Sequence, residues 1–210
     1  MRISGTLASL AGLEQALEKE DPWLIEIAVR RINLLRSIML SVGGVPLIYL
    51  GDEWGALNDY TYLSDPAKAQ DSRWVHRFRR KWEARDDLTE VDTLEWRFYN
   101  ELVRLVSLRK SLPAMYNGGF EVVDTGNPHL FAYVRRNHAQ QLMIVNNFSE
   151  DDQRVEPHFF EKAGFGNGTT DLISGAQLPP GAPLALDGYG YAWLEGAAVY
   201  AVPRIPPNST

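Results

Sequence analysis

The sequence lacks cysteine altogether across its 210 residues. This absence excludes a disulfide framework and a thiolate metal site. No apolar run reaches the roughly 18 residues that a membrane-spanning helix requires, and the opening residues do not have the pattern of a secretory signal peptide. The sequence therefore predicts a cytoplasmic protein with no membrane partner.

Positive charge is scarce as well, since 21 Lys and Arg stand against 27 Asp and Glu, for a formal net charge of −6. We set nucleic acid aside as a partner, because its phosphates attract proteins with basic surfaces. His129, His138 and His158 are too scattered for a metal site. The glycine-rich run at 164–168 lacks the strand and helix that would make it a phosphate-binding loop.

The N-terminal half carries helical signals. Thr6 is a candidate N-cap, and Asp21 before a proline predicts the start of a longer helix. Apolar residues then recur at helical spacing until two glycines at 43–44 end the helix. Another helix is expected from a cap at Thr93 to a stop at Pro113.

Between these helices lies a short apolar run, VPLIYL, at residues 45–50. Such a run predicts a strand buried on both faces, as in a parallel sheet covered by helices. The polar residues GDE follow at once, at the strand end where α/β barrels place functional side chains. The long connection at 54–85 has little regular pattern, but its aromatic side chains argue against disorder.

Beyond residue 118 the apolar pattern changes from helical to alternating. Short strands are expected, with turn residues between them, at 120–123, 130–135, 142–148, 153–156, 170–173 and 191–194. Several short strands at such spacing predict an antiparallel β-sandwich.

This order of elements resembles the end of the α-amylase family of glycoside hydrolases (family 13). Residues 44–53 (GVPLIYLGDE) resemble its eighth barrel strand, and residues 108–114 (LRKSLPA) resemble the end of its eighth helix. A closer resemblance, to amylosucrases and sucrose hydrolases, rests on ISGT at 3–6, LAGL at 10–13, LND at 57–59, DSRWVHR at 71–77, NNFS at 146–149 and WLE at 193–195.

The resemblance implies an α/β plus all-β fold class in three parts. Residues 1–115 would be the C-terminal part of a (β/α)8 barrel, including the loop after the eighth strand. Residues 118–200 would be the antiparallel β-sandwich, and 201–210 a flexible tail. Since such a barrel needs about 250 residues, the barrel part would lack most of its partners, and we expect the chain to self-associate.

The family's chemistry uses a nucleophilic carboxylate and an acid/base carboxylate roughly 5–5.5 Å apart. The resemblance places these groups on strands that precede residue 1. We therefore expect no catalytic residue in this chain and no activity from it alone. No cofactor is expected, because sucrose itself carries the activated glucosyl bond.

The resemblance assigns Arg73 to the sucrose pocket, where this arginine pairs with an aspartate from the early barrel. Its fixed fork of donors suits sugar hydroxyls and a carboxylate at once; the alternative is a solvated surface arginine. Five neighbours are candidates to orient such groups by hydrogen bonds: Asp52, Glu53, Asn58, Asp59 and Asp71. The alternatives are a barrel-rim pair for Asp52 and Glu53, and a turn or a direct sugar contact for Asn58 and Asp59.

Other side chains in this region have two interpretations each. His76 is a candidate proton shuttle, but the basic stretch at 73–81 also fits a solvated helix start. Trp54, Trp74 and Trp82 either stack on sugars or pack the long loop.

Two hypotheses of function result. The first is the C-terminal portion of an amylosucrase-like glucosyltransferase, which moves glucose from sucrose to an α-1,4-glucan and releases fructose; sucrose hydrolysis is its near neighbour. Its partners would be sucrose and α-glucan. The second is a glucan-binding or partner-docking module built on the β-sandwich, without catalysis.

Overall fold

The computed structural model describes residues 3–78 and 91–196, and the chain divides into two units, Met1–Arg109 and Lys110–Thr210. Trp82 and the expected tail at 201–210 lie outside the described residues. Within the described ranges, no helix has both the length and the apolar character to cross a membrane.

The first unit opens with the helices α1 (Leu7–Leu10), α2 (Leu13–Glu18) and α3 (Pro22–Ser41). Both expected caps are confirmed. The Thr6 hydroxyl accepts a hydrogen bond from the Ser9 N–H, and the Asp21 carboxylate accepts two from the first turn of α3. These bonds satisfy backbone donors that a helix start otherwise leaves free.

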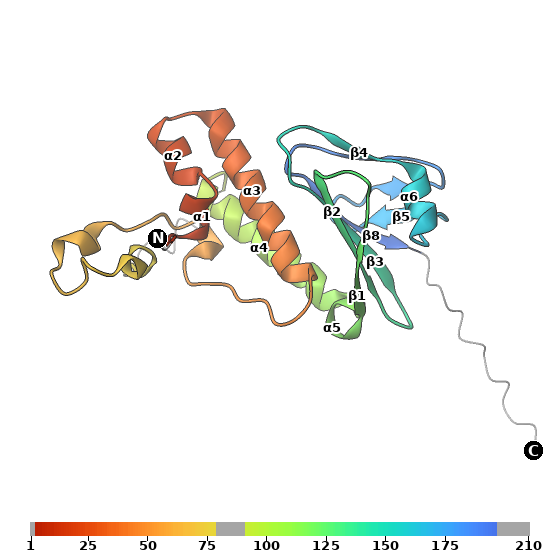
Figure 1. The fold of residues 1–210 in the computed structure, drawn as a ribbon, viewed down its shortest axis with the longest axis horizontal. Helices are drawn as coiled ribbons and strands as arrows, with labels where there is room; N and C mark the ends of the chain where they lie inside the picture. Colours follow the sequence, from red (N-terminus) through yellow and green to blue (C-terminus); the bar gives the residue numbers. More distant parts are fainter. Residues whose placement is uncertain (1–2, 79–90, 197–210) are drawn as a thin grey trace, which may run out of the picture. The chain divides into compact units, whose positions relative to one another are not determined.

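The last helix of this unit, α4 (Leu94–Ser111), lies beside α3 and parallel to it (Figure 1). At the start of both helices, Arg97 forms an ion pair of 2.6 Å with Glu26. At their ends, Arg109 donates a hydrogen bond to the carbonyl of Leu40. The expected cap at Thr93 is confirmed, since its hydroxyl accepts from the Trp96 N–H at 3.1 Å. Phe98 of α4 is buried in a core with Val29 and other apolar residues of α1, α2 and α3.

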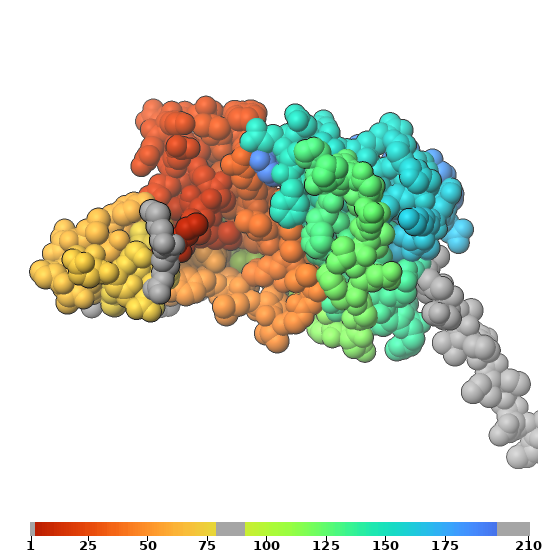
Figure 2. Space-filling model, in the orientation of Figure 1, coloured from red at the N-terminus to blue at the C-terminus, as the bar shows by residue number. Residues whose placement is uncertain are grey.

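The expected strand at residues 45–50 is wrong. The segment forms no ladder, and Val45 and Leu47 are 96% and 78% exposed. Atoms of this orange-coloured region lie at the surface in Figure 2. A strand exists only where a neighbour supplies hydrogen-bond partners, and none of the described residues does so here. The apolar run therefore stays unpaired.

After this run come three short 3-10 helices, η1 (Asp52–Trp54), η2 (Thr61–Ser64) and η3 (Ser72–His76). A long irregular connection was expected at 54–85. In the part of it that the structure describes, the regular elements are these short helical turns. Gly51 is required at its start, because φ is +104° and a Cβ there would lie 2.4 Å from the Phe78 ring.

The second unit begins with α5 (Ala114–Asn117) and contains a six-stranded antiparallel sheet. In spatial order the strands are β1 (Gly119–Val123), β2 (Leu130–Arg136), β3 (Gln141–Asn147), β8 (Tyr191–Gly196), β5 (Thr169–Asp171) and β6 (Gln177–Leu178). A separate pair is formed by β4 (Gln153–Val155) and β7 (Leu184–Leu186). The strands expected from alternation are present.

The core of the second unit lies between these two sheets. Met143 of β3 and Leu194 of β8 face Val155 of β4, Leu186 of β7 and the phenylalanines of α6 (Pro157–Lys162). Every residue of β3 is buried, because β2 and β8 flank it and both of its faces are covered. A two-layer antiparallel domain with few helices results.

Asn147 shows why the NNFS motif is structural. Its side-chain amide donates to the carbonyls of Asp151 and Asp187 at 2.8 and 2.9 Å, and its side-chain oxygen accepts from the N–H of Ser149. One fully buried asparagine thereby joins the turn after β3 to the turn before β8. Buried polar groups persist where they are satisfied in this way.

Candidate functional site around Arg73

Arg73 and Asp71 form the most tightly joined pair among the predicted site residues. The Arg73 Nε lies 2.8 and 2.9 Å from the two Asp71 oxygens, and its Nη2 lies 2.7 Å from Oδ2. Asp71 also caps η3 by accepting from the Arg73 N–H. The hydrogen bonds that Arg73 donates lower the pKa of Asp71 to about 2, and the same bonds raise the pKa of the Arg73 guanidinium.

The pair is open to solvent, with the Arg73 side chain 52% exposed. A two-pronged contact fixes the plane of the guanidinium, but an exposed ion pair is worth little to stability. The arrangement can therefore present a charged, oriented fork of donors at the surface of the first unit. That Arg73 reaches a sucrose pocket stays a prediction.

Asp52 and Glu53 lie in the η1 turn after the apolar run. The Glu53 Oε2 accepts a 2.7 Å hydrogen bond from the Gly51 N–H, which closes the turn. Burial raises the pKa of Asp52, and its hydrogen bond with the Leu7 backbone and the charge of Arg36 counteract part of that increase. Both acids thus have partners within the first unit.

Arg36 was not among the predicted site residues, although it organises this turn. It is only 2% exposed, donates at 2.8 Å to the Phe98 carbonyl, and also donates to the Asp52 carbonyl. Its guanidinium carbon lies 5.3 Å from the Phe98 ring centroid, within the range of a cation–π contact. The sequence signal was present, since Arg36 stands four residues after the buried Ile32, on the apolar stripe of α3.

Asn58 and Asp59 hold the connection to the start of the chain. The Asn58 side-chain oxygen accepts from the Thr6 N–H at 2.9 Å, and its amide donates to Glu14 at 3.0 Å. Asp59 accepts from the Thr61 N–H, the Asx-turn that was one of the two interpretations, and hydrogen bonds from Thr61 lower its pKa. Glu14 is a second residue that sequence reasoning missed, because its contact spans 44 positions.

The aromatic side chains of the connection are packed against charged or aromatic neighbours. Trp74 has the Lys68 Nζ at 5.2 Å and the Arg77 guanidinium at 5.4 Å from its ring. His76 meets Tyr49 edge-on at 5.5 Å, and its Nδ1 is buried with no hydrogen-bond partner in the described part of the chain. Among residues 3–78 and 91–196, no group of three potential ligands could hold a metal ion.

The chain thus consists of an α-helical unit followed along the sequence by an antiparallel two-sheet domain. The helical unit carries the exposed Arg73–Asp71 ion pair. Residues 120–193 match the family model described as the C-terminal domain of maltogenic amylase. The second unit is therefore similar to the C-terminal domains of the α-amylase family, glycoside hydrolase family 13.

Two curated proteins illustrate what else this chain is similar to. Glucosylglycerate phosphorylase of Escherichia coli is 31% identical over 129 residues, which are 60% of this chain and 22% of that protein. Trehalose synthase/amylase TreS of Mycolicibacterium smegmatis is 24% identical over 205 residues, 82% of this chain and 34% of that protein. The chain thus spans about a third or less of these relatives.

Solved structures share the fold. A variant of AmyP in complex with maltotriose superposes with a TM-score of 0.67 at 16% identity, covering 82% of this chain and 35% of that one. An isomaltulose synthase variant of Erwinia rhapontici, solved with its natural substrate sucrose, gives 0.57 at 17%, covering 79% and 38%.

Proposed function

We propose that this chain is the C-terminal portion of a sucrose-using α-glucan glucosyltransferase of the amylosucrase type. In this proposal Arg73 closes the glucosyl pocket, while the catalytic carboxylates are supplied by earlier barrel strands. The chain alone would then be inactive. The observation that carries the proposal is the exposed, oriented Arg73–Asp71 fork within the DSRWVHR motif.

The arrangement of α3 and α4 supports assigning the first unit to a barrel end. Consecutive helices that run parallel require the chain to return between them, and a strand makes that return in α/β folds. The unpaired segment at 45–50 lies on this return path and carries the apolar residues of a covered strand. A parallel strand on either side would supply the hydrogen bonds that it lacks.

A substrate role for sucrose is consistent with the relatives. One structural neighbour binds sucrose as its natural substrate. Arg73 would pair with a carboxylate of the early barrel, exchanging Asp71 for it or sharing with it, and a guanidinium has donors enough for both. Such a contact would limit the pocket to one glucosyl unit.

A chimera tests the proposal. The chain is joined in frame behind strands one to seven of an amylosucrase barrel, and fructose release from sucrose is measured. We expect activity, and a loss of about 10²-fold in kcat/KM for Arg73→Ala, because misplacing the glucosyl group costs that much. Gln15→Ala, on the exposed side of α2, is the control. A folded chimera that cleaves maltooligosaccharides but not sucrose would contradict the proposal.

A further inference from the structure

A hydrogen-bonded network joins the start of the chain to the connection at residues 57–62. Its centre is the Asn58 side chain, whose Oδ1 accepts from the Thr6 N–H at 2.9 Å and whose Nδ2 donates to the Glu14 Oε2 at 3.0 Å. The same Nδ2 donates to the Tyr60 hydroxyl at 3.1 Å, and that hydroxyl lies 3.3 Å from the same Glu14 oxygen. The backbone N–H of Asn58 donates to the Ser9 hydroxyl at 2.9 Å. Asn58 is therefore bonded to α1, to the residue that caps α1 and to α2.

The partners of the Asn58 side chain require an amide at this position. The Thr6 N–H can only donate, whereas the Glu14 carboxylate can only accept. An aspartate in place of Asn58 would accept from Thr6, but it would also set a second negative charge against Glu14. A side-chain amide offers one acceptor and one donor group, so it satisfies both partners at once.

The loop before α1 lies directly against this network. A Cβ added at Gly5 would lie 3.0 Å from the Leu10 Cγ and 3.3 Å from the Asn58 Oδ1. The first distance is shorter than the roughly 3.5–4.0 Å at which non-bonded carbon atoms pack. Glycine at this position thus permits the loop to approach Asn58 closely.

The N-terminal loop and the connection also contact η3, the turn that carries Arg73. The Asp59 N–H donates to the Val75 carbonyl at 2.8 Å, and Val75 is 5% exposed. In the N-terminal loop, the Ser4 hydroxyl lies 3.4 Å from the Ser72 hydroxyl. Because Arg73 stands between Ser72 and Val75, the turn is contacted on both sides of the arginine.

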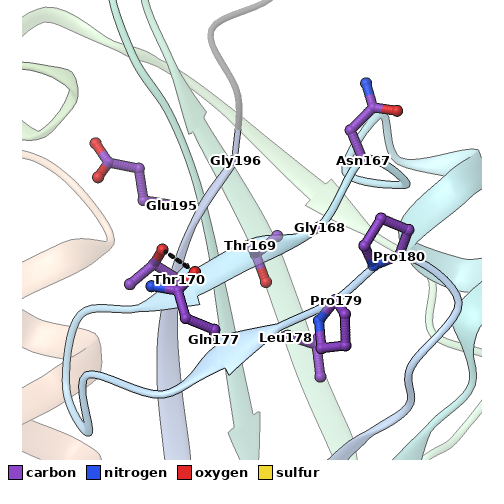
Figure 3. A pocket seen from close by; sticks show the side chains of 10 residues that line it. All are labelled: Asn167, Gly168, Thr169, Thr170, Gln177, Leu178, Pro179, Pro180, Glu195 and Gly196. Atoms are coloured by element: carbon purple, nitrogen blue, oxygen red, sulfur yellow. Dashed lines mark hydrogen bonds between the residues drawn. The ribbon is translucent and has the colours of Figure 1, made fainter.

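Side chains, rather than a backbone ladder, hold these segments together. On the second unit the reverse holds: Thr170 and Gln177 are neighbours on paired strands, and their side-chain contact of 3.1 Å follows from the register (Figure 3). Asn58 and Glu14 are 44 positions apart and lie in no paired strands. Loss of a side-chain contact should therefore loosen the segments around Asn58, whereas it would leave the strand pair in register.

The contact between Arg73 and Asp71 does not by itself fix where the guanidinium lies in the first unit. Asp71 caps the turn that contains Arg73, so their contact orients the guanidinium relative to η3 but not η3 relative to the helices. We propose that Asn58 and Glu14 are positioning residues, which hold η3 and the Arg73 guanidinium in a fixed position relative to α1 and α2. This inference rests on the proposed function, in which Arg73 closes the glucosyl pocket.

Kinetics of the chimera with the barrel strands test the action through Arg73. Asn58→Ala should raise KM for sucrose about tenfold, because a displaced guanidinium loses a hydrogen bond to the sugar, while kcat should stay within about twofold. A loss of folded protein would instead lower the apparent kcat and leave KM unchanged. Combined with Arg73→Ala, Asn58→Ala should raise KM no further, since residues that act through one contact are not additive.

Glu14→Gln and Asn100→Ala serve as matched controls. Glu14→Gln keeps an acceptor oxygen for Asn58, so KM should stay within about twofold of the wild-type value, whereas Glu14→Ala should raise it as Asn58→Ala does. Asn100→Ala removes an exposed asparagine whose amide donates to the Trp96 carbonyl one turn earlier on α4, and KM should not change.

Distance measurements on the full 210-residue chain test the positioning without any sucrose chemistry. Because the chain has no cysteine, spin labels attach only at introduced cysteines. Gln15→Cys on α2 and Gln70→Cys, just before η3, replace exposed side chains. Electron–electron double resonance should give one narrow distance distribution for this labelled chain and for its Asn100→Ala variant. Asn58→Ala should give a broader distribution, because η3 is no longer held against the helices.

An unchanged distance distribution in Asn58→Ala would overturn the inference. So would an active chimera in which Asn58→Ala leaves KM unchanged, or raises it equally with and without Arg73. A broadened distribution beside a chimera that does not cleave sucrose would support the positioning of η3 and contradict the proposed function alone. The two proposals can thus fail independently.

Discussion

Two apolar runs in this chain have opposite outcomes. Residues 141–147 form β3, in which every residue is buried between β2 and β8. Residues 45–50 are more uniformly apolar, yet they form no ladder, and Leu47 is 78% exposed. An apolar run can thus form a central strand, but it does so only where neighbouring strands supply its hydrogen-bond partners.

The largest effect should come from truncating a leucine in the core beside the buried run and, for comparison, a leucine in the exposed run. Leu194→Ala, beside β3 in the core, should lower the free energy of unfolding of the second unit by about 2–5 kcal/mol, because it leaves a cavity. Leu47→Ala should change stability by less than about 0.5 kcal/mol, because an exposed side chain loses little. Denaturant titration of the chain measures both, and a large cost at Leu47 would break the comparison.

The second-largest loss of stability should come from replacing Arg36, a buried side chain of the first unit. Arg36→Met removes the buried guanidinium that donates to the carbonyls of Phe98 and Asp52, and we expect a loss of about 2–4 kcal/mol. Arg30→Met is the matched control on the same helix, since its ion pair with Glu26 is exposed and worth at most about 0.5 kcal/mol. Thermal melts followed by circular dichroism would show equal losses if Arg36 were only a surface residue.

Self-association through the exposed run is a smaller expected effect. We propose that residues 45–50 pair or cluster between copies of the chain, because exposed strand-like apolar segments do so. Leu47→Lys should shift sedimentation velocity profiles toward monomer, because charge on an edge opposes pairing. Leu63→Lys, at a comparably exposed leucine of η2, should not. Equal profiles for wild type and Leu47→Lys would argue against this role.

The smallest effect concerns the Arg73–Asp71 fork. The contact lowers the pKa of Asp71 to about 2. The ion pair should therefore remain ionised at pH 4 and be lost only when the pH falls through the pKa of Asp71. NMR titration of the Asp71 carboxyl carbon measures the midpoint. In Arg73→Ala the midpoint should rise toward the ordinary value for aspartate. A normal midpoint in the wild type would mean that the fork is not formed in solution.

Local signals predicted much of the fold. The caps at Thr6, Asp21 and Thr93 depend only on neighbouring residues, so they could be predicted from short patterns. The strands of the second unit followed from alternation. The two-residue β6 and three-residue β7 are too short for a period, and α6 was missed although Pro157 at its start is a helix signal.

Long-range partners account for most of what could not be predicted. The contact between Asn58 and Glu14, and that between Arg36 and Phe98, join positions far apart in sequence. The order of the strands likewise depends on pairing, since β8 inserts between β3 and β5. For the candidate site, sequence order brought Asp71 and Arg73 together, whereas the assignment of Arg73 to a sugar pocket rests on resemblance.

Amide hydrogen exchange tests the central claim most directly, namely that residues 45–50 are a strand awaiting neighbours. In the chain alone, we predict that these amides exchange freely while those of β3 are protected. In the chimera with barrel strands one to seven, residues 45–50 should gain at least about hundredfold protection. Protection of residues 45–50 in the chain alone, or none in an active chimera, would contradict the account.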